Sequence, residues 1–196
     1  MSLLISVIRP ELVRLAVDTE ALWPDGTRDQ VSKLVVVPHA SLVCVGQGDA
    51  SLNGCLFKHL VMGRGTMDYD NAISAVPRAI ADFVVTLRAH GVTGGYRVHL
   101  AGYSPARGRM LGHLWEGSVD SDEVDDDEMG AEGIGFAIAP WQSERPPIPD
   151  SPTEFHALAA EQVKLLREAG TAGGGCLMLT EITTAEVRIR NIGPLL

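Results

Sequence analysis

The sequence predicts an α+β fold in which two mainly antiparallel β-sheets are stacked and a helical layer covers the outside of each. The first observation is the order of the elements: four strands, two helices, two or three strands, one helix and two strands. This order does not alternate strand and helix, which disfavours a doubly wound dinucleotide-binding fold. The second observation is size. A chain of 196 residues that is 45% hydrophobic can form one domain with a substantial core.

The first four predicted strands form two hairpins. Residues 3–8 and 12–22 flank one short turn, and residues 33–38 and 40–48 meet at another. Short apolar runs bounded by proline-containing turns are typical of antiparallel hairpins. Because apolar residues begin directly after Ser2, we expect the start of the chain to be held in a sheet rather than frayed.

The later elements combine helical and strand-like periodicity. Apolar residues recur at helical spacing in residues 49–63, 71–91 and 155–170. Asp70 or Asn71 is the expected N-cap of the second helix, which contains Pro77. Ser151 and Glu154 have the spacing of a capping box before the third helix. Predicted strands occupy residues 95–104, 108–117, 133–141, 173–182 and 186–193.

The net charge of −9 comes from a single segment. Residues 116–132 hold nine acidic residues and no basic one, so the other 16 acids balance the 16 Lys and Arg. Few of these residues can pack and their charges repel, which predicts an acidic flexible loop. Loose cation binding or recognition of a basic partner is the less favoured interpretation. Nucleic acid is not an expected partner, because no basic patch with interleaved aromatic residues occurs.

Several functional classes are disfavoured by composition. No apolar run approaches the ~18 residues of a spanning helix, and the first residues lack a basic signal-peptide stretch, so we expect a cytoplasmic protein without a membrane partner. Cys44, Cys55 and Cys176 are widely spaced in apolar surroundings, which indicates core positions rather than a disulfide framework or a zinc site. The six His are scattered, and neither a metal site nor a cofactor is predicted.

Five residues carry a family resemblance. Ser2 begins the first predicted strand, Asp18 and Thr19 close the second, Lys33 begins the third, and Gly46 follows the fourth. Together with the order of the elements, these residues resemble the proteasome-like N-terminal-nucleophile (Ntn) hydrolases, which include proteasome β-subunits and simpler bacterial relatives. The resemblance covers nearly the whole chain. It implies a four-layer αββα sandwich formed by a single domain over residues 1–196.

The resemblance also implies a reaction, the hydrolysis of an amide or peptide bond. Ser2, exposed by removal of Met1, would be the nucleophile, and its own α-amine, with a usual pKa of about 7.7 to 8.0, would be the base. Lys33 would stabilise developing charge and Asp18 would orient it. The backbone N–H of Gly46 would bind the oxyanion.

Two further residues are implied near the end of the last helix. In the family an acid and a hydroxyl support the site there, and Glu168 and Thr171 are the nearest matches. One departure concerns a supporting Gly-Ser-Gly turn of active β-subunits, which has no counterpart around Ala137, Ala139 and Pro140.

Three interpretations of function therefore stay open. The first is a hydrolase that resembles a proteasome β-subunit. The second is a catalytically silent protein of the same fold with a structural or binding role. The third, an unrelated α/β binding module, requires that residues 2–46 do not form two stacked hairpin sheets.

The resemblance finally implies a homo-oligomer, a ring or a helical array that associates through the first two helices. Those helices carry many apolar residues, namely Leu52, Leu56, Leu60, Val61, Met62, Ile73, Val76, Ile80, Phe83, Val84 and Leu87. The alternative is that these residues only complete the core of the monomer.

Overall fold

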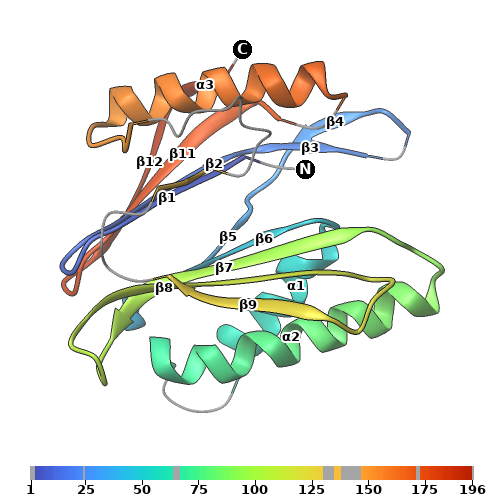
Figure 1. The fold of residues 1–196 in the computed structure, drawn as a ribbon, viewed down its shortest axis with the longest axis horizontal. Coiled ribbons are helices and arrows are strands. Elements are labelled where there is room, and N and C mark those ends of the chain that lie inside the picture. Colours follow the sequence, from blue (N-terminus) through green and yellow to red (C-terminus); the bar gives the residue numbers. More distant parts are fainter. Residues whose placement is uncertain are drawn as a thin grey trace.

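Two five-stranded antiparallel sheets face one another in the computed structural model, which describes residues 3–23, 25–63, 67–129, 135–137, 147–170 and 173–195 (Figure 1). The upper sheet of Figure 1 contains, in spatial order, β10 (Gly135–Ala137), β1 (Leu4–Ile8), β2 (Val13–Asp18), β11 (Cys176–Ile182) and β12 (Val187–Pro194). The lower sheet contains β5 (Leu34–Val37), β6 (Leu42–Gln47), β7 (Gly95–Ser104), β8 (Arg109–Ser118) and β9 (Val124–Met129).

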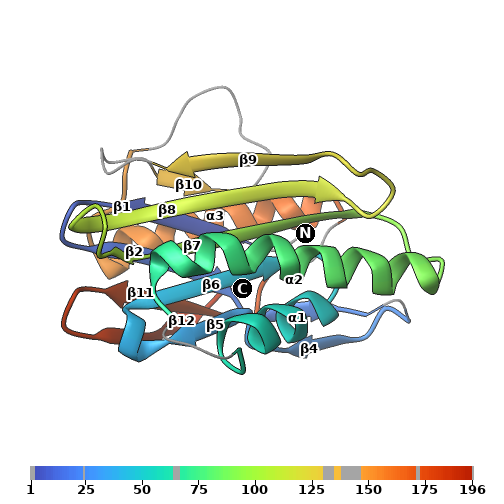
Figure 2. The same ribbon diagram turned by 90° about the horizontal axis from the view of Figure 1, so that it is seen from below.

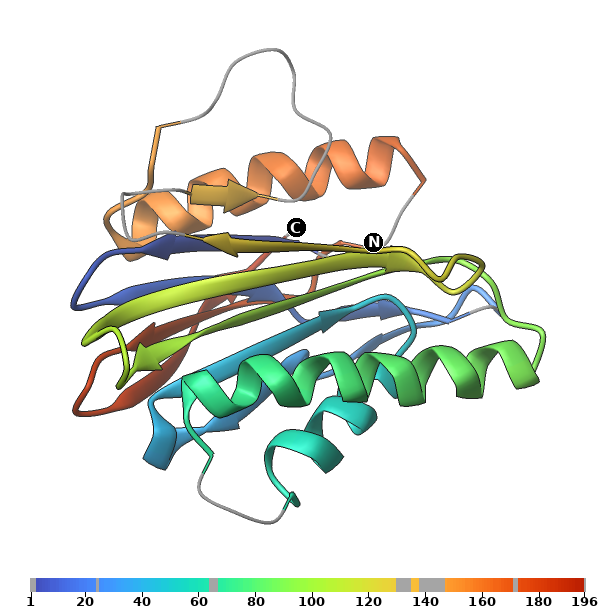
Figure 3. The same cartoon turned by 60° about the horizontal axis from the view of Figure 1, so that its bottom comes forward.

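Helices cover the outer face of each sheet. The upper sheet carries α3 (Pro152–Glu168), and the lower sheet carries α1 (Ser51–Leu60) and α2 (Tyr69–Ala89) (Figures 1 and 3). Seen from below, α1 and α2 lie side by side across the lower sheet (Figure 2). No helix within the described residues is long and apolar enough to cross a membrane.

Alternation of side chains along the strands produces three apolar clusters. Leu4, Leu15, Val43 and Ala101 belong to the cluster between the sheets. Residues of opposite parity pack outward, against α3 from the upper sheet and against α1 and α2 from the lower sheet. Each sheet is therefore apolar on both faces, because each has a second layer to contact.

The helix ends follow local capping chemistry. Ser151 accepts a hydrogen bond from the Glu154 N–H, and Glu154 binds back to the Ser151 N–H, which confirms the predicted capping box of α3. The N-cap of α2 is Asp68 rather than Asp70 or Asn71, because the carboxylate of Asp70 binds Ser104 and the backbone of the β7–β8 turn instead.

One additional hairpin interrupts the second predicted strand. After β2 the chain forms β3 (Glu20–Leu22) and β4 (Arg28–Gln30), which pair only with each other. The chain then crosses from the upper to the lower sheet before β5 (Figure 1). A short 3-10 turn over Pro38–Ala40 joins β5 and β6.

The acidic segment is more ordered than its composition predicts. The loop expected over residues 116–132 requires correction, since β8 extends to Ser118 and residues 124–129 form β9 at the edge of the lower sheet. Backbone groups pair β9 with β8, and among its exposed acidic side chains Asp126 also contacts His113 on β8. Charged residues on an exposed edge strand discourage pairing with another sheet. Residues 130–132 lie outside the described part of the chain.

Candidate functional site

Asp18 is the centre of the candidate site. Its side chain ends β2 and is fully buried, with 0% exposure. Oδ1 accepts hydrogen bonds from the Leu3 N–H at 2.9 Å and from Lys33 Nζ at 2.7 Å. Oδ2 accepts one from the Gly174 N–H at 3.3 Å. Three segments that are distant in sequence therefore meet at one carboxylate.

The fold dictates this meeting point. In the β1–β2 pair Leu4 lies opposite Val17, so that Leu3 and Asp18 are adjacent at the end of the hairpin. In the β2–β11 pair Asp18 lies opposite Leu177, which brings the preceding glycine turn beside it. Lys33 ends the segment that crosses between the sheets and is only 5% exposed.

Burial opposes the charges of this ion pair. It lowers the pKa of Lys33, while the Asp18 carboxylate and the charge of Glu20 act in the opposite direction. Burial likewise raises the pKa of Asp18, which the Lys33 ammonium and the Leu3 and Gly174 N–H groups counteract. An amine with a lowered pKa, held against one carboxylate, is a typical arrangement of functional sites.

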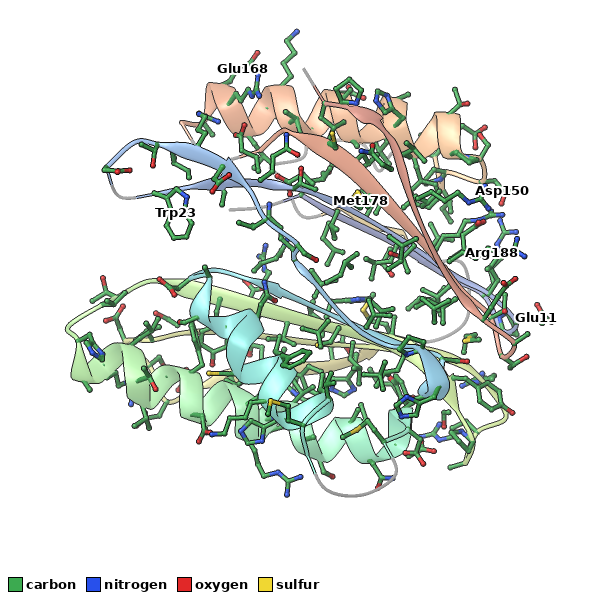
Figure 4. The ribbon with its side chains drawn as sticks, turned by 180° about the vertical axis from the view of Figure 1, so that it is seen from behind. Glu11, Trp23, Asp150, Glu168, Met178 and Arg188 are labelled. Atoms are coloured by element: carbon green, nitrogen blue, oxygen red, sulfur yellow. The ribbon has the colours of Figure 1, made fainter. Side chains whose placement is uncertain are left out.

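An apolar cavity of about 410 Å³ adjoins the ion pair. Asp18 and Lys33 form part of its wall, and most of its other lining is aliphatic, from Val17, Val31, Leu34, Val36, Met178 and Ile189. Figure 4 shows Met178 on β11, on the side of the space between the two sheets. A cavity of this size with few polar groups is suited to an apolar side chain or a small ligand.

Gly46 lies next to Lys33 but its N–H is engaged. The pairing of Leu34 with Val45 places Gly46 across from Lys33, one position further along the strands. The Gly46 N–H donates to Oδ1 of Asn53 on α1 at 3.2 Å. A Cβ at position 46 would lie 2.7 Å from the same oxygen, so only glycine allows this close approach.

Of the three remaining predicted site residues, the structure describes Glu168 alone. Ser2 and Thr171 lie outside the described residues. Glu168 is exposed at the end of α3 (Figure 4). Its neighbour Arg167 instead binds the carbonyl of Gly173 at 3.0 Å, close to the bond from Gly174 to Asp18.

Sequence reasoning missed two contributors to this site, Gly174 and Asn53. The available signal for Gly174 was the run of three glycines before β11, which indicates a backbone that must approach other groups closely. Nothing in the sequence distinguishes Asn53 from any other polar residue on a helix. Among the described residues, no group of three or more His, Cys, Asp or Glu side chains is arranged to hold a metal ion.

Comparison with known proteins identifies the class of fold. No protein-family model matches the chain, and a search of curated proteins finds no match. Solved structures of Anbu are similar, and a Gly-1 mutant of Anbu from Hyphomicrobium sp. strain MC1 matches with a TM-score of 0.70 and 12% identity, over 98% of this chain and 87% of that one. The chain thus has a proteasome-like fold.

Two further Anbu structures agree with this assignment. Another structure of Anbu from the same strain has a TM-score of 0.63 and 14% identity, over 97% of this chain and 87% of that one. Anbu from Yersinia bercovieri, described as an ancestral β-subunit, has a TM-score of 0.67 and 11% identity, with coverage of 96% and 87%. At these identities the likeness describes the fold alone.

Proposed function

We propose that this chain is a proteasome β-subunit-like Ntn hydrolase, which cleaves amide or peptide bonds with Ser2 after removal of Met1. In this proposal the two stacked sheets and their helices form the four-layer αββα sandwich of such enzymes. The observation that carries the proposal is the shared oxygen of Asp18, which binds both the Lys33 amine and the Leu3 N–H. The buried Lys33 amine is thereby held near the Leu3 N–H, which belongs to the peptide bond between Ser2 and Leu3.

The proposed reaction needs one hydroxyl and one amine. Ser2 Oγ attacks the carbonyl carbon while its proton passes to the α-amine of the same residue. The α-ammonium then protonates the departing amine, the C–N bond breaks, and an ester to Ser2 remains. Water, activated by the same α-amine, hydrolyses this ester. Throughout, the Lys33 ammonium stabilises the negative charge that develops on the carbonyl oxygen of the substrate, and Asp18 keeps the Lys33 side chain oriented.

The oxyanion donor requires a rearrangement at Gly46. Its N–H is bound to Asn53 Oδ1, so a substrate oxygen has to displace that contact. Rotation of the Asn53 carboxamide would release the Gly46 N–H and turn the amide NH₂ toward the same position. Asn53 would then be a second donor to the oxyanion.

The cavity supports a preference for apolar substrate residues. Its aliphatic lining lies directly beside the Asp18–Lys33 pair. Burial of an apolar side chain in this cavity is favourable because apolar surface leaves water. A charged side chain there would lose its hydration without gaining a partner of its own. We therefore propose a peptide or amide whose residue at the cleavage site is aliphatic.

A catalytically silent protein of the same fold is the second candidate. The observation that favours it is the engaged N–H of Gly46, since an oxyanion donor that is already bound cannot stabilise a transition state. In that case the buried ion pair would only hold the start of the chain in the upper sheet.

Assembly through the two lower helices is part of both candidates. Most of the apolar residues on which this expectation was based are buried within the monomer, including Leu52, Leu56, Ile80 and Phe83. Four large apolar side chains on α1, α2 and the residues just after α1 remain exposed: Phe57, Val61, Met62 and Val85. We propose that these residues contact neighbouring copies in a ring or helical array.

Hydrolysis by matched lysine variants tests the proposal. We expect the wild-type protein to release a fluorophore from peptides with an aliphatic residue before the amide. Lys33→Met should lose about 10²-fold or more of this rate, as expected for removal of an electrostatic contact to the oxyanion. Lys164→Met, which changes an exposed lysine on α3, is the control and should keep the full rate. Full hydrolysis by folded Lys33→Met would contradict the proposed mechanism.

A further inference from the structure

We infer that Glu20 is a positioning residue of the Asp18–Lys33 site. Glu20 connects the β3–β4 hairpin and the end of α3 to the glycine turn that binds Asp18. Its catalytic consequence rests on the proposed function, whereas its contacts and its effect on Lys33 do not. Glu20 was not among the residues singled out by the sequence.

Glu20 is a buried acid with several donors around it. It is 8% exposed and begins β3, directly after Asp18 and Thr19. Its Oε1 accepts hydrogen bonds from Arg28 on β4 and from the Gly173 N–H at 3.3 Å. Its Oε2 lies 3.7 Å from Nη2 of Arg167 on α3. A carboxylate at this depth is retained only when such partners replace its hydration.

The backbone continues this network to Asp18. The Glu20 N–H donates to the Gly174 carbonyl at 3.3 Å, and the Gly174 N–H donates to Asp18 Oδ2 at 3.3 Å. Glu20 therefore holds the turn twice, through its side chain at Gly173 and its backbone at Gly174. The glycine turn binds Oδ2 of Asp18, the oxygen that does not contact Lys33.

Gly174 lies close to the charged ends of Glu20 and Arg167. Gly174 has a φ of +148°, which L side chains rarely adopt. A Cβ there would lie 2.5 Å from Arg167 Nη2 and 3.0 Å from Glu20 Oε2. The ion pair of Glu20 and Arg167 is thus packed directly against the peptide whose N–H reaches Asp18.

Charge gives Glu20 a second effect on the site. Its negative charge raises the pKa of Lys33 and so opposes the effect of burial. Arg28 and Arg167 are positive and more exposed, with side chains 47% and 37% accessible, and they offset part of this field. The hairpin can therefore influence the protonation of Lys33 through the contact between Arg28 and Glu20.

The experiment measures titration of Lys33 in the folded protein, which needs no substrate. The chain has three lysines, Lys33, Lys58 and Lys164, so protein labelled with ¹³C at the lysine Cε gives three signals. Lys33→Met assigns the signal of interest. The matched control for Glu20 is Glu181, a part-buried acid that likewise bridges two arginines, Arg14 and Arg190.

Opposite shifts are expected from the two partners of one ion pair. Glu20→Gln should move the Lys33 titration to lower pH, and Arg28→Gln should move it to higher pH, while Glu181→Gln leaves it in place. A purely structural role would not reverse sign between Glu20 and Arg28. If neither variant moves the Lys33 titration, the inference is overturned, and Arg28→Gln keeps the test decisive if Glu20→Gln fails to fold.

Kinetics separates this inference from the proposed function. If the protein is a hydrolase, Glu20→Gln should lower kcat about tenfold or more with little change in KM, because the lysine is misplaced rather than the substrate. Glu20→Asp, which keeps the charge, should restore part of the rate. Absence of hydrolysis in the wild type would contradict the proposed function but leave the Lys33 titration as an independent result.

Discussion

Acid sensitivity of the inter-sheet core should depend largely on His99. This residue lies on the face of β7 that also carries Ala101, a member of the cluster between the sheets, and it is 1% exposed. Neither ring nitrogen has a hydrogen-bond partner among the described residues. Burial, with a smaller contribution from His113, lowers the pKa of His99 to about 4.

The sign and size of the effect follow from this pKa. In the unfolded chain the pKa of His99 is about 6.5, well above its value in the folded protein. The stability contributed by neutral His99 is therefore fully present above pH 6.5 and is lost as pH falls toward 4. At 1.36 kcal/mol for each pKa unit, the loss over this range is about 3 kcal/mol.

Urea unfolding at several pH values between 7 and 4 tests this reasoning. His99→Leu should remove about 3 kcal/mol of the pH dependence of the free energy of unfolding, since leucine cannot bind a proton. His39→Gln changes an exposed histidine and should follow the wild type. If His99→Leu and wild type lose stability in parallel as the pH falls, His99 is not the acid-sensitive group and the argument from burial fails.

Three further substitutions probe the turn, the acidic edge and the helical surface. Gly174→Ala should lower the free energy of unfolding by about 2 kcal/mol or more in urea titrations, whereas Gly54→Ala, with open space at its Cβ, should not lower it. Asp125→Lys should raise the free energy of unfolding by about 0.5 kcal/mol, and with it the melting temperature slightly, because Asp125 lies opposite Glu116; 1 M NaCl should abolish the gain. Met62→Asp should reduce the assembly mass in light scattering, and a wild-type species of 20.9 kDa at tens of micromolar would refute the assembly itself.

Much of the fold follows from sequence periodicity because the strands and helices bury regular faces. The capping box of Ser151 and Glu154 and the buried runs of β1, β2 and β6 are local features that a sequence displays directly. The edge strand β9 is different, since its order comes from backbone bonds to β8 and its side chains resemble a solvated loop. The β3–β4 hairpin was hidden because Ala21 and Leu22 prolong the apolar run of β2, whereas β4 consists of three exposed polar residues without a strand-like pattern.

The residues of the candidate site were likewise predictable only in part from the sequence. Asp18 and Lys33 were identified through the family resemblance, and the structure brings them into contact. Glu20 and Gly174 were not, because the bonds that join them are made by backbone groups more than 150 residues away in the chain. Glu168 was selected by residue type at the end of α3, whereas position on the helix directs Arg167 toward the site and leaves Glu168 exposed.

The central claim is that Ser2 becomes a reactive N-terminal nucleophile. Intact mass of the wild-type protein and of Ser2→Ala, each before and after treatment with a β-lactone probe, tests this most directly. The account predicts a wild-type mass that lacks Met1 and gains a single probe, together with no adduct on Ser2→Ala. A wild-type mass that retains Met1 and gains no probe under any condition would contradict it.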